Sequence, residues 1–175
     1  MLEDRRIKEA EHNIRNYLAE QLLKKTNINE NIKNIFINNS KESLKVANLL
    51  FKNNHSDLWT IVCSYYSMYY MANAVLYNLG YKVGHEISHK ITADALIVLV
   101  RNKLKKSLIQ DYEEAQTEAL EIAGIKADEL IKNFDQERAK RGRLQYRMTE
   151  SIKHAKAKTS LERAKRFVFE MGKLI

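Results

Sequence analysis

Apolar residues recur every three or four positions along most of the chain, and this spacing predicts amphipathic helices. The first predicted helix covers about residues 2–25 and has a charged face opposite its apolar stripe. That stripe consists of Ile7, Ala10, Ile14, Leu18 and Leu22. A short second helix is predicted for about residues 27–38, and the polar cluster at residues 38–40 is expected to end it. A new helix should then start at Ser40 and run to the polar break at residues 53–56.

The most apolar predicted helix covers residues 57–79, with Ser56 as its N-cap and Gly80 closing it. Two neighbouring stripes follow its length: Leu58, Val62, Tyr65, Tyr69, Ala72 and Leu76 in one, and Tyr66, Tyr70, Asn73 and Tyr77 in the other. Because both stripes need cover, we expect this helix at the core, with the tyrosines between 65 and 77 or the last helix in a twofold dimer contact. Stacking of nucleic-acid bases on the tyrosines is the alternative, but helices this apolar are more often interior.

Helical spacing continues towards the carboxyl terminus. A helix is predicted for residues 92–105, and apolar residues keep helical spacing from 108 to 134, interrupted only by Gly124. Residues 159–162 read Thr-Ser-Leu-Glu, which matches a capping box, so the final helix is expected to begin there.

The composition agrees with helices throughout. The 175 residues include no proline, five glycines and a single cysteine, Cys63. One cysteine allows neither an intramolecular disulfide nor a cysteine-based zinc cage within one chain, which suits a reducing cytoplasm. The longest aliphatic run is residues 95–100, and the amino terminus has no signal-peptide pattern, so we expect neither a membrane span nor export. The predicted fold class is all-α: an antiparallel bundle with an up-and-down core and an N-terminal helical extension.

Positive charge is concentrated in the last fifth of the chain. Residues 138–175 contain twelve Lys or Arg and three acidic residues, a balance of +9, whereas the whole chain carries +8. Such a segment is typical of a surface that binds phosphate groups of RNA or a nucleotide. The predicted binding residues are Arg138, Lys140, Arg141, Arg143, Lys153, Lys156 and Lys158. The alternative is a solvated helix face, since lysine and arginine are also good helix formers.

One short motif suggests a metal. His85, Glu86 and His89 spell the His-Glu-x-x-His pattern of zinc peptidases, which needs both histidines on one regular helix. The preceding Gly-Tyr-Lys-Val-Gly should turn instead, and no residue stands at a spacing that marks a third ligand. We therefore expect no metal and no other cofactor, and keep the zinc peptidase as a remote alternative.

The order of these segments resembles the HEPN domain of bacteria and archaea. The resemblance covers about residues 40–174 and rests on five stretches: SKESLKVANLLFKNN, SYYSMYYMANAVLYNLGY, VGHEISHKITADAL, RAKRGRLQYRMTE and TSLERAKRFVFEM. It implies a helical-bundle domain at residues 40–175, preceded by an extension at residues 1–39. HEPN domains commonly dimerise and bind RNA, and some pair with a small nucleotidyltransferase.

The resemblance also implies candidate catalytic residues. HEPN ribonucleases use an arginine and a nearby histidine before the last core helix, and Arg147 and His154, with six residues between them, match that motif. In the implied metal-independent mechanism His154 assists attack by the ribose 2′-hydroxyl, and Arg147 stabilises charge on the phosphate. On one unbroken helix the two would lie ~10 Å apart along the axis, so a bend within 148–158 or a twofold dimer is needed to bring them together.

Two functional interpretations follow from these observations. The first is an RNA-binding HEPN protein, with metal-independent ribonuclease activity in a toxin–antitoxin or defence system. The alternative is a catalytically silent HEPN dimer that acts as partner of a small nucleotidyltransferase. The segment Arg-Leu-Gln-Tyr at 143–146 favours this alternative, because silent HEPN-like chains carry a similar segment. Neither interpretation involves a membrane.

Overall fold

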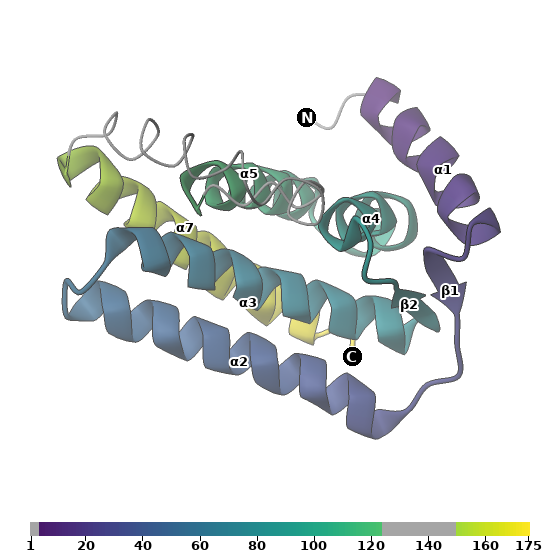
Figure 1. The fold of residues 1–175 in the computed structure, drawn as a ribbon, viewed down its shortest axis with the longest axis horizontal. Helices are drawn as coiled ribbons and strands as arrows, with labels where there is room; N and C mark the ends of the chain where they lie inside the picture. Colours follow the sequence, from purple (N-terminus) through teal and green to yellow (C-terminus); the bar gives the residue numbers. More distant parts are fainter. Residues whose placement is uncertain (1–3, 124–149) are drawn as a thin grey trace, which may run out of the picture.

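The structure is a computed structural model that describes residues 4–123 and 150–175 (Figure 1). Long helices form the body of the fold: α2 (Glu30–Lys52), α3 (Asp57–Asn78), α5 (Lys106–Ala123) and α7 (Glu150–Gly172). Towards one end lie the amino-terminal helix α1 (Asp4–Ala19), helix α4 (Ser88–Ala95), the π-helical turn η1 (Leu96–Val100) and the 3₁₀ turn η2 (Arg101–Lys103). The predicted all-α fold class is confirmed.

The long helices alternate in direction along the sequence, as expected for an up-and-down bundle. Helices α2 and α3 lie side by side and antiparallel in Figure 1. Helix α5 is antiparallel to α7, because Asp111 near the start of α5 pairs with Arg166 near the end of α7. Helix α7 runs in the same direction as α3, since the Asn78 amide at the end of α3 donates to the Leu174 carbonyl just after α7. The carboxyl end of α2 and the amino ends of α3 and α7 therefore meet at one end of the bundle.

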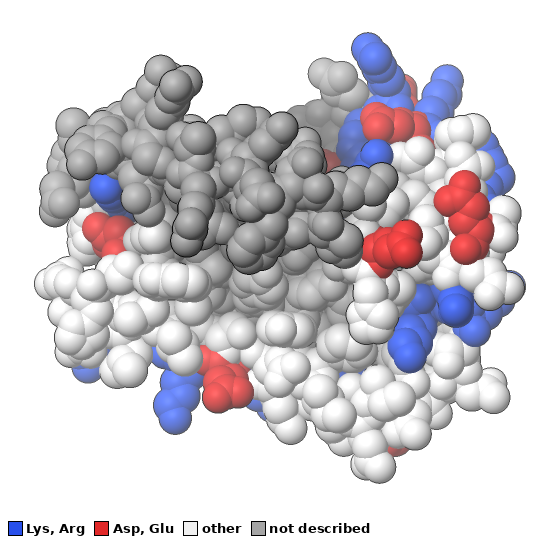
Figure 2. Space-filling view, viewed as in Figure 1, with Lys and Arg blue, Asp and Glu red and all other residues white. Residues whose placement is uncertain are grey.

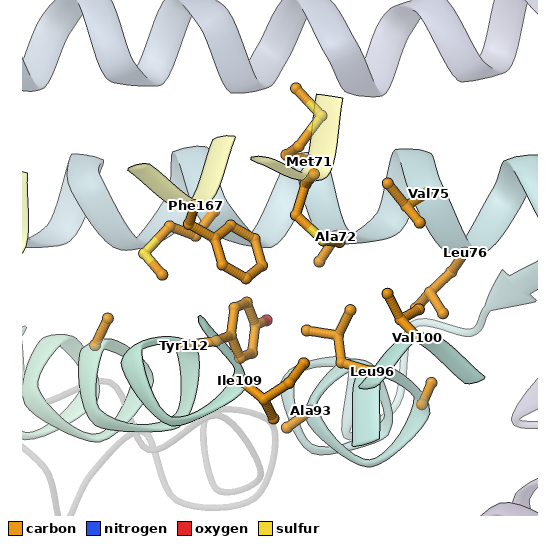
Figure 3. Close-up of a cluster of buried hydrophobic side chains, with 14 of the residues drawn as sticks. Met71, Ala72, Val75, Leu76, Ala93, Leu96, Val100, Ile109, Tyr112 and Phe167 are labelled. Carbon is orange, nitrogen blue, oxygen red and sulfur yellow. The ribbon is translucent and has the colours of Figure 1, made fainter. Parts of the chain in front are cut away.

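Helix α3 lies at the centre of the bundle and packs against α2, α5 and α7. Its predicted boundaries are confirmed: the Ser56 hydroxyl accepts a hydrogen bond from the Trp59 amide at 3.2 Å, and Gly80 takes a φ of +83° just after the helix. Figure 3 shows α3 residues such as Met71 and Ala72 near the facing rings of Tyr112 and Phe167. Within the described ranges, no helix is long and apolar enough to cross a membrane.

Helix α2 is continuous, so the predicted break at residues 38–40 is wrong. The Ser40 side chain is fully buried, and its hydroxyl donates to the Ser67 carbonyl of α3 at 2.7 Å. Packing against α3 therefore keeps the helix intact through a polar segment whose intrinsic propensity is weak. The boundary that we predicted between extension and bundle, at residues 39 and 40, falls inside this helix.

The last helix also begins earlier than predicted. Helix α7 is regular from Glu150 and passes through the capping-box sequence without a break. The Thr159 hydroxyl bonds back to the Ala155 carbonyl at 3.0 Å, as Thr side chains do within helices, and the Ser160 hydroxyl donates to Glu118 of α5 at 2.9 Å. Both side chains are thus engaged by the helix and its neighbour, so the predicted start at Thr159 is wrong.

A small sheet, which the helical prediction did not include, pairs the segment that follows α1 with the segment that follows α3. Helix α1 ends at Ala19 instead of near residue 25, and strand β1 (Leu23–Lys25) pairs antiparallel with β2 (Tyr81–Val83), which follows α3. Leu22, the last residue of the predicted stripe, lies beyond the end of α1, and its neighbour Leu23 is buried as part of the strand. Gly84 closes the pair: its amide donates to the Leu22 carbonyl at 2.8 Å, where a Cβ would collide with that oxygen.

Helix α1 is held to the bundle by a buried carboxylate. Asp94 of α4 has no exposed surface, and the guanidinium of Arg6 in α1 lies 2.6 Å from it. The Asn13 amide and the Tyr17 hydroxyl, both from α1, donate to the same carboxylate at 3.0 and 3.1 Å. Because a buried charge needs such partners, α1 is fixed to α4 by a specific polar contact.

Candidate functional site

His154 lies where three helices meet at one end of the bundle. Its ring projects from the first turns of α7 and stacks on Phe51 near the end of α2, with ring centroids 4.8 Å apart and an interplanar angle of 15°. Its Nδ1 atom is 3.0 Å from the Oδ1 atom of Asp57, the first residue of α3. About half of the His154 side chain is exposed, compared with a quarter of the Asp57 side chain. The histidine is therefore both anchored and accessible.

This geometry suits acid–base chemistry. A histidine ring has two nitrogens, and the hydrogen bond made by one of them decides which role the other takes. Nδ1 of His154 is occupied by Asp57, and within the part of the chain that the structure describes Nε2 has no hydrogen-bond partner. An accessible imidazole nitrogen within reach of a substrate is the usual requirement for a general acid or base.

Two of the predicted lysines flank His154 without ion-pair partners. Lys153 is half-buried and Lys158 is exposed, and neither forms an ion pair with the described residues. The third, Lys156, lies 3.6 Å from Glu118 of α5, so its charge is partly compensated. Among the described residues, only Lys156 of these three lysines therefore has an acidic neighbour.

Further along α7 the arginines face acidic residues of α5. Arg163 contacts Glu114 and also lies 3.7 Å from Asp111 and 3.9 Å from Glu118. Arg166 contacts Asp111 as well. The charge of these two arginines is thus compensated by acidic residues that come from another helix. The face of the molecule drawn in Figure 2 is mostly uncharged where it is described, with acidic and basic side chains both present.

Most of the predicted cations lie outside the described residues. These are Arg138, Lys140, Arg141, Arg143 and the candidate catalytic Arg147. Helix α7 is regular from Glu150 onwards, so no bend occurs at residues 150–158. The structure therefore places His154 of the predicted catalytic pair, and the approach of Arg147 to it stays a prediction.

The His-Glu-x-x-His segment does not form one helix. His85 and Glu86 lie in a turn, Ile87 has a left-handed φ of +41°, and α4 begins at Ser88. His89 is the only residue of the motif triplet in α4, and its Nδ1 atom is 2.5 Å from the Tyr65 hydroxyl. The preceding Gly-Tyr-Lys-Val-Gly is not helical, as expected, but Tyr81–Val83 form strand β2 where we predicted a turn. The helical geometry that a zinc peptidase needs is not present in the motif.

His89 belongs instead to a cluster of tyrosines on α3. Its ring centroid lies 4.5 Å from that of Tyr69 and 5.8 Å from that of Tyr66, and the Tyr65 ring packs beside it. Burial, and after it the neighbouring Tyr112, raises the pKa of Tyr65, and burial also raises the pKa of Tyr66 and Tyr69. The cluster is thus mainly packing of the central helix, as its apolar pattern predicted.

Sequence reasoning did not identify Asp57 and Phe51 as neighbours of His154. Asp57 follows the N-cap Ser56 and reads as an ordinary acidic residue in a first helical turn. Phe51 reads as a core residue at the end of α2. Both are about one hundred residues from His154 in sequence, and only the shared end of α2, α3 and α7 brings them together.

No known protein family, curated protein or solved structure matches the chain.

Proposed function

We propose that this chain is a HEPN-like helical bundle that binds RNA where α7 begins and cleaves it there without a metal ion. The proposal rests on the resemblance of residues 40–174 to that family and on the surroundings of His154. It implies action in the cytoplasm, as part of a toxin–antitoxin or defence system.

The observation that carries the proposal is the anchored, half-exposed ring of His154. A histidine that only filled space beside Phe51 would need no carboxylate, whereas a histidine that moves a proton gains a fixed orientation from Asp57. Lys153 and Lys158 are on the same part of α7 and form no ion pair with described residues, so they supply positive charge for phosphates.

In the proposed reaction, Nε2 of His154 accepts the proton of a ribose 2′-hydroxyl. The 2′-oxygen forms a bond to the adjacent phosphorus while the bond from phosphorus to the 5′-oxygen breaks, leaving a 2′,3′-cyclic phosphate. The departing 5′-oxygen takes a proton from water and becomes a hydroxyl. Arg147, which lies outside the described residues, stabilises the charge on the phosphate oxygens in this scheme.

The test is cleavage of a labelled single-stranded RNA in the presence of EDTA. We expect wild-type protein to cut, and His154→Ala to lose turnover by roughly 10²- to 10⁴-fold, the usual contribution of a general base, while retaining most RNA affinity. His55→Ala is the matched control, because His55 is exposed in the loop between α2 and α3 and its ring contacts neither His154 nor Asp57 among the described residues. Turnover that survives in His154→Ala would contradict the mechanism.

A second candidate is a catalytically silent bundle that binds a protein partner, either a second copy or a small nucleotidyltransferase. Large apolar side chains that are half or more exposed favour it: Ile28, Ile35, Leu49, Trp59 and Phe169. Exposed apolar groups of this size often mark protein contacts. Wild-type protein that binds RNA without cutting it would favour this candidate over the ribonuclease. Wild-type protein that neither binds nor cuts RNA would rule out an RNA-binding role for both candidates. Light scattering at micromolar concentration tests the dimer.

A further inference from the structure

Asp57 and Phe51 fix the His154 ring from two directions. Asp57 is at the start of α3, where Ser56 caps the helix, and Phe51 is near the end of α2. The carboxylate meets the edge of the ring at Nδ1, whereas the phenyl ring covers one face. Since each contact comes from a different helix, the orientation of the imidazole is set by the packing of the bundle.

The carboxylate also decides where the ring carries hydrogen. An ionised carboxylate only accepts hydrogen bonds, so Nδ1 must carry a hydrogen to bond with Asp57, whether the ring is neutral or charged. In the neutral ring the lone pair then lies on Nε2. This nitrogen has no partner among the described residues, so none of them competes for its lone pair.

We propose that Asp57 is a positioning residue that holds neutral His154 in the tautomer with hydrogen on Nδ1. The consequence for catalysis rests on the proposed function: in this tautomer Nε2 can accept the proton of the 2′-hydroxyl, and in the other it cannot. Asp57 itself touches neither the substrate nor the reacting atoms, and acts through His154.

The tautomer is measured directly by nitrogen NMR of the imidazole in RNA-free protein at mildly alkaline pH, where an ordinary histidine is neutral. We expect hydrogen on Nδ1 in wild type. In Asp57→Asn the amide can donate to Nδ1 and so favour hydrogen on Nε2, which inverts the assignment. In Asp57→Ala the constraint is lost. Glu162 is an exposed carboxylate on α7 that forms no ion pair with the described residues, so Glu162→Gln should leave the spectrum unchanged. Hydrogen on Nε2 in wild type, or an unchanged spectrum in Asp57→Ala, would overturn the proposal.

Cleavage measurements separate this proposal from the proposed function. In a protein that cuts RNA, Asp57→Asn should lower kcat by roughly 10- to 100-fold, as the loss of an orienting partner does, with little change in RNA affinity. An equal kcat in wild type and Asp57→Asn would contradict the positioning role of Asp57 but not the ribonuclease activity. If wild-type protein does not cut RNA, the proposed ribonuclease function is contradicted. The NMR measurement then still tests the proposed tautomer of His154. Circular dichroism of each variant checks that the fold is retained, which the partial exposure of Asp57 favours.

Discussion

The two halves of α7 use similar residues for different purposes. The first half holds His154 against Asp57 and Phe51 and leaves Lys153 and Lys158 without ion pairs among the described residues. In the second half, the cations Arg163 and Arg166 are paired with acids of α5, and the apolar side chains Phe167 and Met171 are fully buried. One half resembles a site, whereas the other is an interface inside the bundle.

The difference shows that a count of charges along a helix does not locate a ligand surface. Arg163 and Lys158 contribute equally to the net charge, but Arg163 is compensated by three carboxylates from α5 and Lys158 by none among the described residues. Only an uncompensated cation can release counterions when a phosphate binds. Position relative to neighbouring helices therefore matters more than composition.

The largest expected effect tests the interface half through its two phenylalanines. Phe167 is fully buried and faces Tyr112 (Figure 3), with ring centroids 5.4 Å apart. Phe169, in contrast, is two-thirds exposed. Phe167→Ala should lower the free energy of unfolding by about 3–5 kcal/mol, because it leaves a cavity in the core. Phe169→Ala removes little more than its contact with the Lys173 ammonium and should cost at most about 1 kcal/mol. Urea unfolding measures both, and equal losses would contradict the assignment of the second half to the core.

A smaller effect is expected from the cations, and it tests the other half. If Lys153 and Lys158 meet phosphates, replacing both by alanine should reduce the slope of log affinity against log salt by about 2, one for each lost contact. Arg166→Ala is the matched control, because Arg166 is already paired with Asp111. We expect its slope to stay close to that of wild type in fluorescence titrations with RNA. A larger change in Arg166→Ala than in the lysine variant would reverse the comparison between the halves.

The sequence was a good guide wherever periodicity and helix termination decided the structure. Ser56 and Gly80 bound α3 as predicted, and Tyr65, Ala72 and Leu76 of its predicted apolar stripe are buried. Such signals are local, since helix geometry places residues three and four apart on one face. The all-α class followed from them directly.

Prediction was wrong where contacts distant in sequence changed a local signal. The capping box at 159–162 has the right residues, but Ser160 bonds to Glu118 of α5 and the helix continues. Ser40 is held by α3 in the same way. The contact between His154 and Asp57 depends on the shared direction of α3 and α7, which no pattern within either helix encodes.

The smallest effect at neutral pH concerns the Tyr112 hydroxyl, which lies under the second half of α7 beside Phe167. It is fully buried, and burial raises the pKa of Tyr112 well above the usual 10. The unfolded chain loses the Tyr112 proton at a lower pH than the folded chain does. The contribution of Tyr112 to the free energy of unfolding is therefore intact below about pH 10 and is lost as the pH rises further. Tyr112→Phe should therefore change stability by less than about 0.5 kcal/mol at neutral pH and reduce the loss at alkaline pH. Tyr70→Phe, on the half-exposed side of α3, removes a hydroxyl without altering Tyr112 and should keep the alkaline loss of wild type. The measurement is the free energy of unfolding of the three proteins from neutral pH to about pH 11. If Tyr112→Phe loses as much stability at alkaline pH as wild type does, the loss originates elsewhere in the tyrosine cluster.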